Sequence, residues 1–257
     1  MNLLASLGRI ILDFLMAVGQ ISRFAFAATI NIVRLPIYFK MIIRQMMEIG
    51  YFSLPVVGLT AIFTGAVLAL QSYTGFSRFS AESSIATVVV LSITRELGPV
   101  LAGLMVAGRI GASMAAEIGT MKVTEQIDAL VTLSTNPIKY LVTPRVIAAV
   151  LMLPCLVLVS DIIGIFGGYI VSVKKLGFNE VTYLKNTFKY LETMDVILGL
   201  IKAAVFGYII AIIGCYNGYY SKRGAQGVGA ATTNAVVVSS ILILLSNYLA
   251  TELFFAK

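Results

Sequence analysis

Long runs without a charged residue constrain this sequence more than any other feature. No Asp, Glu, Lys or Arg occurs between Glu48 and Arg78, or between Arg223 and Glu252. A helix needs about 20 apolar residues to cross the hydrocarbon core of a bilayer, and both runs are longer. Hydrophobic residues make up 59% of the chain and charged residues 12%, which is too little polar composition for an ordinary soluble domain. The sequence therefore predicts a membrane protein.

The net charge of +7 does not indicate a nucleic-acid partner. The Lys and Arg residues are scattered between apolar segments and form no basic stripe, so anionic lipid headgroups are their expected partners. Cys155 and Cys215 lie inside apolar runs, where we expect both to be small buried hydrophobic side chains. The chain has no His, and its residues predict neither a disulfide nor a metal site.

The N-terminal segment is amphipathic. From Leu3 to Phe24, apolar residues recur every three or four positions, and Arg9 and Asp13 are among the polar residues between them. This pattern is typical of a helix that lies on a membrane surface. A cleavable signal peptide is the alternative, but charges should not interrupt its apolar core. We therefore predict an interfacial helix and elbow over residues 1–47.

Residues 48–256 are expected to form a bundle of five spans. These spans lie between residues 48 and 78, from 83 to about 117, and at 146–173, 196–216 and 224–251. Arg34, Lys40 and Arg44 make the segment before the first span basic, which favours a cytoplasmic N-terminus and places the C-terminus outside. The lysines of loop 174–195 would then also lie outside, a local departure from the positive-inside rule. The predicted fold is an all-α membrane protein with an N-terminal interfacial amphipathic helix followed by five transmembrane helices.

Charged residues inside the predicted spans are the first candidates for a functional site. Arg95 and Glu96 lie in the second span, just before Gly98 and Pro99, where a helix kink is expected. Neighbouring residues on a helix diverge by about 100°, so we expect one of the two charges to face a cavity and the other to pair within the bundle or across a dimer.

Two further charges lie in later spans. Lys202, in the fourth span, either extends to the membrane interface or meets Glu96 or a phosphate inside the bundle. Asp161, in the third span, is a functional carboxylate or a hydrogen-bonded structural one.

Aromatic and polar residues gather at the outer end of the first span, among them Gln71, Tyr73, Phe76 and Phe79. By itself this composition indicates an aromatic belt at the membrane interface. At the opposite end of the second span, Met121, Ile127, Leu130 and Val131 can share one face of a short helix within residues 120–133. Such an apolar face would be exposed unless something covered it, so a partner protein is expected there.

Several activities are excluded by the motifs that the sequence lacks. It contains no GxxxxGK[ST] P-loop, so the chain does not bind ATP in that way. It has neither a G-x-S-x-G nor an HExxH motif, which argues against a hydrolase. We find no selectivity filter or charged ring of the kind that channels use.

The string RELGPVLAGLMVAGRIGASMAAEIGTMKVTEQIDAL, from Arg95 to Leu130, resembles the signature of the MlaE-type permease family. The similarity extends more weakly from about Tyr51 to Phe255. Members of that family are membrane subunits of ABC transporters that move lipid together with Mce-domain proteins in bacteria with two membranes. The resemblance implies a single permease domain over residues 1–257 in the bacterial inner membrane, with a periplasmic C-terminus.

The resemblance also implies roles for the candidate residues. It favours a lipid-binding pocket over an aromatic belt, and it favours the pairing of Lys202 inside the bundle. The implied substrate-binding residues are Arg95, Glu96, Lys202, Leu68, Gln71, Phe76 and Phe79. The implied coupling helix, which docks into the ATPase subunit, contains Met121, Lys122, Glu125, Gln126, Ile127, Asp128 and Leu130.

The function implied by the resemblance is transport of phospholipid between the inner membrane and a periplasmic Mce-domain carrier, which maintains the lipid asymmetry of the outer membrane. The implied partners are a second copy of this chain, a cytoplasmic ABC ATPase that binds ATP and Mg²⁺, a STAS-domain protein and the Mce-domain protein. The chain itself would have no catalytic site, metal or cofactor. The alternative from a different class is a membrane scaffold that only anchors a cytoplasmic partner.

Overall fold

The computed structural model describes residues 3–34, 36, 38–79 and 84–255 of the chain. Its helices are α1 (Leu3–Val33), α2 (Phe39–Ile49), α3 (Leu54–Phe76), α4 (Ile85–Ser92), α5 (Gly98–Val106), α6 (Ala112–Val123), α7 (Gln126–Thr132), α8 (Thr143–Ile170), α9 (Glu180–Lys189), α10 (Thr193–Tyr219) and α11 (Ala225–Phe255). π-helical turns at residues 93–97 and 107–111 connect α4, α5 and α6 into one continuous helical segment.

Six helical segments in the described residues are long and apolar enough to cross a membrane. Five of them overlap the five predicted spans: Phe39–Phe76, Ile85–Val123, Ile138–Lys175, Thr193–Tyr219 and Ala225–Leu253. The sixth, Ile11–Val33, belongs to α1. The prediction of an all-α membrane protein is confirmed, and the chain crosses the membrane several times.

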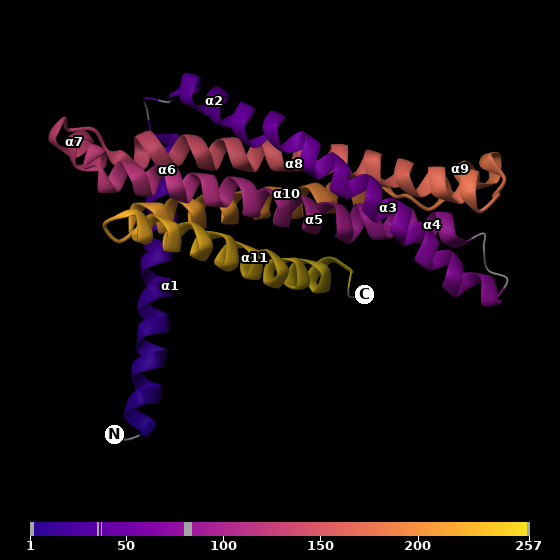
Figure 1. The fold of residues 1–257 in the computed structure, drawn as a ribbon, viewed down its shortest axis with the longest axis horizontal. Coiled ribbons are helices and arrows are strands. Elements are labelled where there is room, and N and C mark those ends of the chain that lie inside the picture. Colours follow the sequence, from indigo (N-terminus) through magenta and orange to yellow (C-terminus); the bar gives the residue numbers. More distant parts are fainter. Residues whose placement is uncertain (1–2, 35, 37, 80–83, 256–257) are drawn as a thin grey trace.

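Helix α1 extends further than predicted, to Val33 and not only to Phe24. Residues 25–33 contain neither Gly nor Pro, so nothing in the sequence ends the helix there. Figure 1 shows that α1 runs across the direction of the other long helices. Phe24 and Ala28 are buried, and the ring of Phe24 contacts Tyr216 at a centroid distance of 5.6 Å. This direction fits a helix in the membrane plane, although the interfacial placement itself stays a prediction.

Small residues allow α3 and α8 to pack in close contact. Ala61, Gly65 and Ala69 are buried at every fourth position of α3. A Cβ atom at Gly65 would collide with the backbone carbonyl of Gly164 in α8, so only glycine permits this approach. Without a hydrophobic drive inside lipid, this close backbone packing is a main source of helix association. Figure 1 shows the two helices crossing near the middle of the bundle.

We expect Gly65→Leu to lower the free energy of unfolding by about 3 kcal/mol, because the backbone of Gly164 cannot yield as a flexible side chain would. Thermal unfolding in detergent micelles measures the change. Gly75→Leu is the matched control, since a Cβ at Gly75 on the same helix has nothing within 4 Å. If both variants unfolded at the wild-type temperature, the close α3–α8 contact would be contradicted.

Candidate functional site

The candidate site begins with Pro99, which disturbs the hydrogen bonding of its own helix. Proline has no backbone N–H, and its ring clashes with the carbonyl four residues earlier, which here belongs to Arg95. The structure relieves this clash with the π-helical turn Ile93–Leu97, where Gly98 N–H donates to the carbonyl of Ile93. The predicted helix distortion is therefore a π-helical turn, and the Arg95 carbonyl is available to another donor.

Lys202 of α10 supplies that donor. Its ammonium donates to the Arg95 carbonyl at 3.1 Å, to Oε1 of Glu96 at 2.9 Å and to Oγ1 of Thr251 at 2.8 Å. Lys202 is only 2% exposed. An ammonium group has three donors, and these three acceptors match them. Of the two alternatives for Lys202, the structure shows the pairing with Glu96 inside the bundle.

Both carboxylate oxygens of Glu96 have partners. Asn247 of α11 donates to Oε2 at 2.8 Å, and Thr251 donates to Oε1 at 2.8 Å. The side chain of Glu96 is still 34% exposed. We call Glu96, Lys202, Asn247 and Thr251 the polar cluster. It joins three separate segments of the chain, the π-helical turn, α10 and α11.

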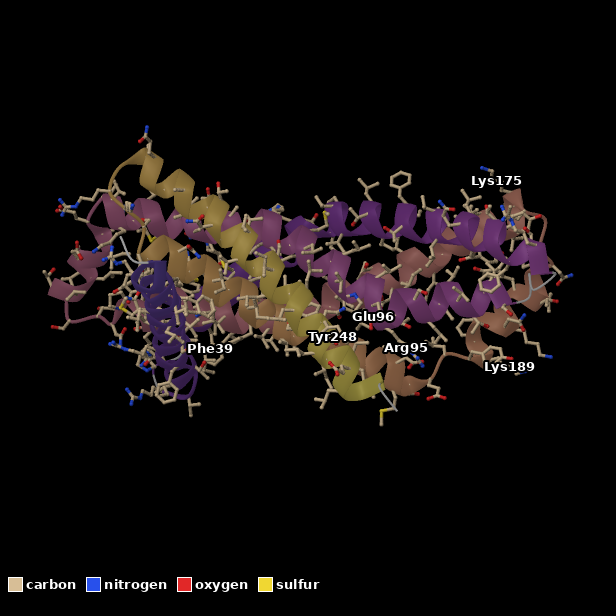
Figure 2. All side chains as sticks on the ribbon, turned by 90° about the horizontal axis from the view of Figure 1, so that it is seen from below. Phe39, Arg95, Glu96, Lys175, Lys189 and Tyr248 are labelled. Atoms are coloured by element: carbon tan, nitrogen blue, oxygen red, sulfur yellow. The ribbon has the colours of Figure 1, made fainter. Side chains whose placement is uncertain are left out.

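Arg95 points to a different place on α10. Its Nε donates to Oδ1 of Asp195 at 2.8 Å, and Asp195 is 2% exposed. Asp195 also caps its own helix, because its Oδ2 accepts from the backbone N–H of Glu192. We expected only one of the neighbouring charges to pair within the bundle, but both do, since Asp195 and Lys202 are two turns apart on the same helix. Figure 2 shows Arg95 and Glu96 on the side of the bundle near Tyr248 of α11.

Three polar residues of the site, Asn247, Thr251 and Asp195, were not predicted from the sequence. Asn247 and Thr251 are uncharged and stand four residues apart in an otherwise apolar span, a spacing that could have indicated a polar face. Asp195 precedes the predicted start of its span, where an acidic residue suits a helix N-terminus. Each of them meets a residue that is at least 49 positions away in the chain.

Leu68, Gln71 and Phe76, which were also predicted to bind substrate, lie on α3. Leu68 and Gln71 line a shallow groove of about 390 Å³ together with residues of α3 and Leu97. Phe76 packs with Leu68 against a second core cluster around Ala69 and Ile85. The side chain of Phe79 lies outside the described residues. Within one chain the groove contains no charged side chain, so the structure does not bring the charges and Leu68 into a single pocket.

The predicted coupling segment forms the end of α6, a turn at Thr124 and Glu125, and α7. Figure 1 shows α7 at one end of the bundle and α9 at the other. Ile127 is 1% exposed, and Met121 and Leu130 also pack on the core. The apolar face is therefore covered mostly by the chain itself, contrary to our expectation that a partner would be needed to cover it. Gln126, Asp128 and Val131 are exposed, and Lys122 pairs with Asp128 at 3.0 Å.

Two other sequence expectations concern single residues of α8. Cys155 is exposed on the outer surface, so the expectation that both cysteines are buried is wrong for this one, whereas Cys215 is buried. Asp161 is buried, and its Oδ1 has no hydrogen-bond partner among the described residues. A Cβ atom at Gly98 would collide with this carboxylate, which shows how tightly it is enclosed. The described residues contain no group of three or more potential metal ligands.

Helices of spanning length and an internal cluster of paired charges define a polytopic membrane protein with a candidate functional site inside its bundle. Comparison with known families makes this class specific. The family described as "Permease MlaE" matches residues 42–253. The chain belongs to the MlaE permease family.

Curated relatives agree with this family over nearly the whole chain. A "Probable ABC transporter permease protein" of Rickettsia felis is 69% identical, covering 99% of this chain and 98% of that protein. The "Intermembrane phospholipid transport system permease protein MlaE" of Haemophilus influenzae is 34% identical, with the same coverage of both chains. The chloroplastic "Protein TRIGALACTOSYLDIACYLGLYCEROL 1" of Arabidopsis thaliana is 37% identical over 88% of this chain and 65% of that protein.

We expect Lys202→Met to lower the free energy of unfolding by about 2–3 kcal/mol, because Glu96 would lose its main partner inside the bundle. The double variant Lys202→Met with Glu96→Gln should recover most of this loss. Thermal unfolding in detergent measures both. Lys122→Met is the control, since its pair with Asp128 is exposed and should contribute less than about 1 kcal/mol. Additive effects of the two substitutions would contradict a coupled pair.

Proposed function

We propose that this chain is the permease subunit of an ATP-driven ABC transporter that moves phospholipid between the inner membrane and a periplasmic Mce-domain carrier. This transport would maintain the lipid asymmetry of the outer membrane. The observation that carries the proposal is that a charged surface and an apolar surface lie next to each other at residues 95–97. Arg95 and Glu96 present partly exposed charges, and Leu97 lines an apolar groove. The family and the name of the Haemophilus relative support the same substrate class.

A phospholipid has the two kinds of surface that this arrangement offers. Its acyl chains would lie against Leu68 and the neighbouring apolar residues of α3, with Gln71, Phe76 and Phe79 toward the outer end. Its phosphate would be attracted to Arg95, whose side chain is 34% exposed, and a headgroup ammonium to Glu96. Arg95 would exchange its bond to Asp195 for one to the phosphate. Lys202 would hold Glu96 in place through their ion pair, and its positive charge would offset that of the carboxylate.

A second copy of the chain would complete the cavity. The groove beside Leu68 is shallow, and its residues Phe63 and Val67 are 66% and 56% exposed. Opposing two such grooves across a twofold axis would enclose both acyl chains and bring the charges of each copy to the rim of one cavity. A homodimer is therefore part of the proposal.

The energy would come from a partner subunit, since the chain has no P-loop. A cytoplasmic ABC ATPase that binds ATP and Mg²⁺ would dock on residues 120–133. Met121, Ile127 and Leu130 would anchor this segment to the bundle, while Lys122, Glu125, Gln126 and Asp128 would face the partner. The N-terminus would be cytoplasmic and the C-terminus periplasmic. A STAS-domain protein and the Mce-domain carrier would complete the complex.

Transfer of phospholipid tests the site directly. The complex is reconstituted into vesicles with radiolabelled phospholipid, and ATP-dependent transfer to the soluble Mce domain is measured. We expect Glu96→Gln to reduce transfer at least about tenfold, the effect of losing one contact to a charged group, while the ATPase still copurifies. Lys189→Gln, a change of an exposed residue on α9, is the control.

The alternatives give different results in the same assay. A scaffold would tolerate Glu96→Gln without any change in lipid transfer, because it needs only its partner contacts. A channel would show conductance across the vesicle membrane without ATP. Either result would contradict the proposed transport function.

Docking of the ATPase gives an independent prediction. We expect the double variant Gln126→Arg and Asp128→Arg to lose the ATPase on copurification, because both side chains are exposed on α7. Lys189→Glu, an equally exposed change of charge on α9, should retain it. Figure 2 shows Lys189 at the opposite end of the bundle from the coupling segment. Retention of the ATPase by the α7 variant would mean that the coupling contact lies elsewhere.

A further inference from the structure

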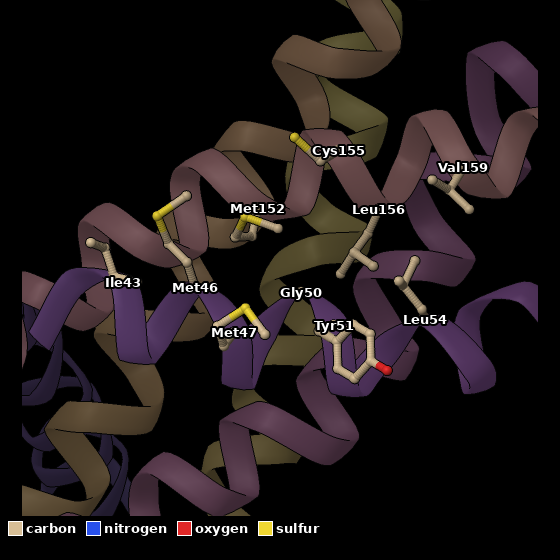
Figure 3. A pocket seen from close by; sticks show the side chains of 10 residues that line it. All are labelled: Ile43, Met46, Met47, Gly50, Tyr51, Leu54, Met152, Cys155, Leu156 and Val159. Atoms are coloured by element: carbon tan, nitrogen blue, oxygen red, sulfur yellow. The ribbon is translucent and has the colours of Figure 1, made fainter. Parts of the chain in front are cut away.

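A second apolar groove, of about 520 Å³, lies on the outer surface of the bundle between α8 and the joint of α2 and α3. One wall is formed by residues from Ile43 to Leu54, spaced three or four positions apart, and the other by residues from Met152 to Val159 with the same spacing. Figure 3 shows these two rows of side chains along neighbouring helices. The groove is distinct from the one beside Leu68, which is formed further along α3 and by Leu97.

The walls of the groove are apolar enough to lie in hydrocarbon. Both of its walls belong to segments of spanning length, Phe39–Phe76 and Ile138–Lys175. Its side chains are apolar apart from the Tyr51 hydroxyl, and three of them are the flexible thioethers of Met46, Met47 and Met152. A concave apolar surface on segments of this kind suits a hydrocarbon chain. Gly50 leaves space for Met152, because a Cβ atom at Gly50 would collide with the end of that side chain.

The dimensions fit one acyl chain. The wall from Ile43 to Leu54 covers eleven helical steps, or about 16 Å at 1.5 Å per residue. That length is about half of the 30 Å hydrocarbon core, and so corresponds to one leaflet.

Two cations stand at one end of the groove. Lys40 and Arg44 are exposed and four residues apart on α2, next to Ile43. Neither belongs to an ion pair among the described residues. Glu48, the nearest acidic residue on α2, pairs with Arg109 at 3.4 Å, which offsets its charge. The end of the groove therefore has a net positive charge available to an anionic headgroup.

We propose that this groove binds one acyl chain of an anionic phospholipid, whose phosphate lies at Lys40 and Arg44. The bound lipid fills the space between the α2–α3 joint and α8 and holds these helices together from outside. It is a resident lipid of the permease, separate from the transported one, and its binding does not require transport.

Cys155 provides a probe inside the groove. The chain has two cysteines, and only Cys155 is exposed. The full chain is labelled with bimane at Cys155 and reconstituted into phosphatidylcholine vesicles that contain phospholipid with brominated acyl chains, which quench bimane on contact. We expect brominated phosphatidylglycerol to quench at a lower mole fraction than brominated phosphatidylcholine. Each of the two cations that contacts the headgroup should lower the mole fraction needed for half-maximal quenching by about fivefold. Lys40→Gln with Arg44→Gln should remove that preference.

A second labelled variant serves as the control. Cys155→Ala with Ile162→Cys moves the label to a residue of the same helix that is 68% exposed and does not line the groove. At this position both brominated lipids should quench equally. Equal quenching at Cys155 would show contact with bulk lipid only and would overturn the proposal. Absence of quenching by either lipid would show that protein covers the groove, and would overturn it as well.

Discussion

The ammonium group of Lys202 requires acceptors inside the bundle, and the packing around the site follows from that requirement. An uncompensated charge in the hydrocarbon is costly, so Lys202 is stable only where several acceptors converge. Pro99 provides one of them indirectly, because it has no N–H to donate to the Arg95 carbonyl four residues earlier. Glu96 and Thr251 provide the others. A single ammonium thus ties α10 to the second span and to the C-terminal part of α11.

The same turn separates two chemical surfaces. Successive side chains on a helix diverge by about 100°, so Glu96 can face the polar cluster while Leu97 lines an apolar groove. A ligand with a charged head and apolar tails would contact both surfaces at once. Neither surface alone would specify a lipid, because paired charges also stabilise bundles and apolar grooves also bind annular lipid. Their apposition at one helical turn is what supports the proposed phospholipid site.

Close packing of small residues keeps this arrangement rigid. Gly65 lets α3 approach the backbone of Gly164, and Gly199 of α10 lies against the carbonyl of Thr94 in the π-helical turn. Because lipid offers no hydrophobic drive for helix association, such contacts contribute much of the stability of the bundle. The long helices are therefore held near the site by backbone contacts as well as by the ion pairs.

The sequence by itself determined the all-α membrane class, the approximate spans and the presence of Arg95, Glu96 and Lys202 inside them, because long apolar runs and charges within them have few physical interpretations. Only the tertiary structure decided the partners. Asn247 and Thr251 are ordinary polar residues until folding brings them to Glu96 from about 150 positions away, and local periodicity contains no information about such contacts. The outward position of Cys155 was predicted wrongly from the sequence, because in a membrane span an apolar run covers lipid-facing and buried sides alike.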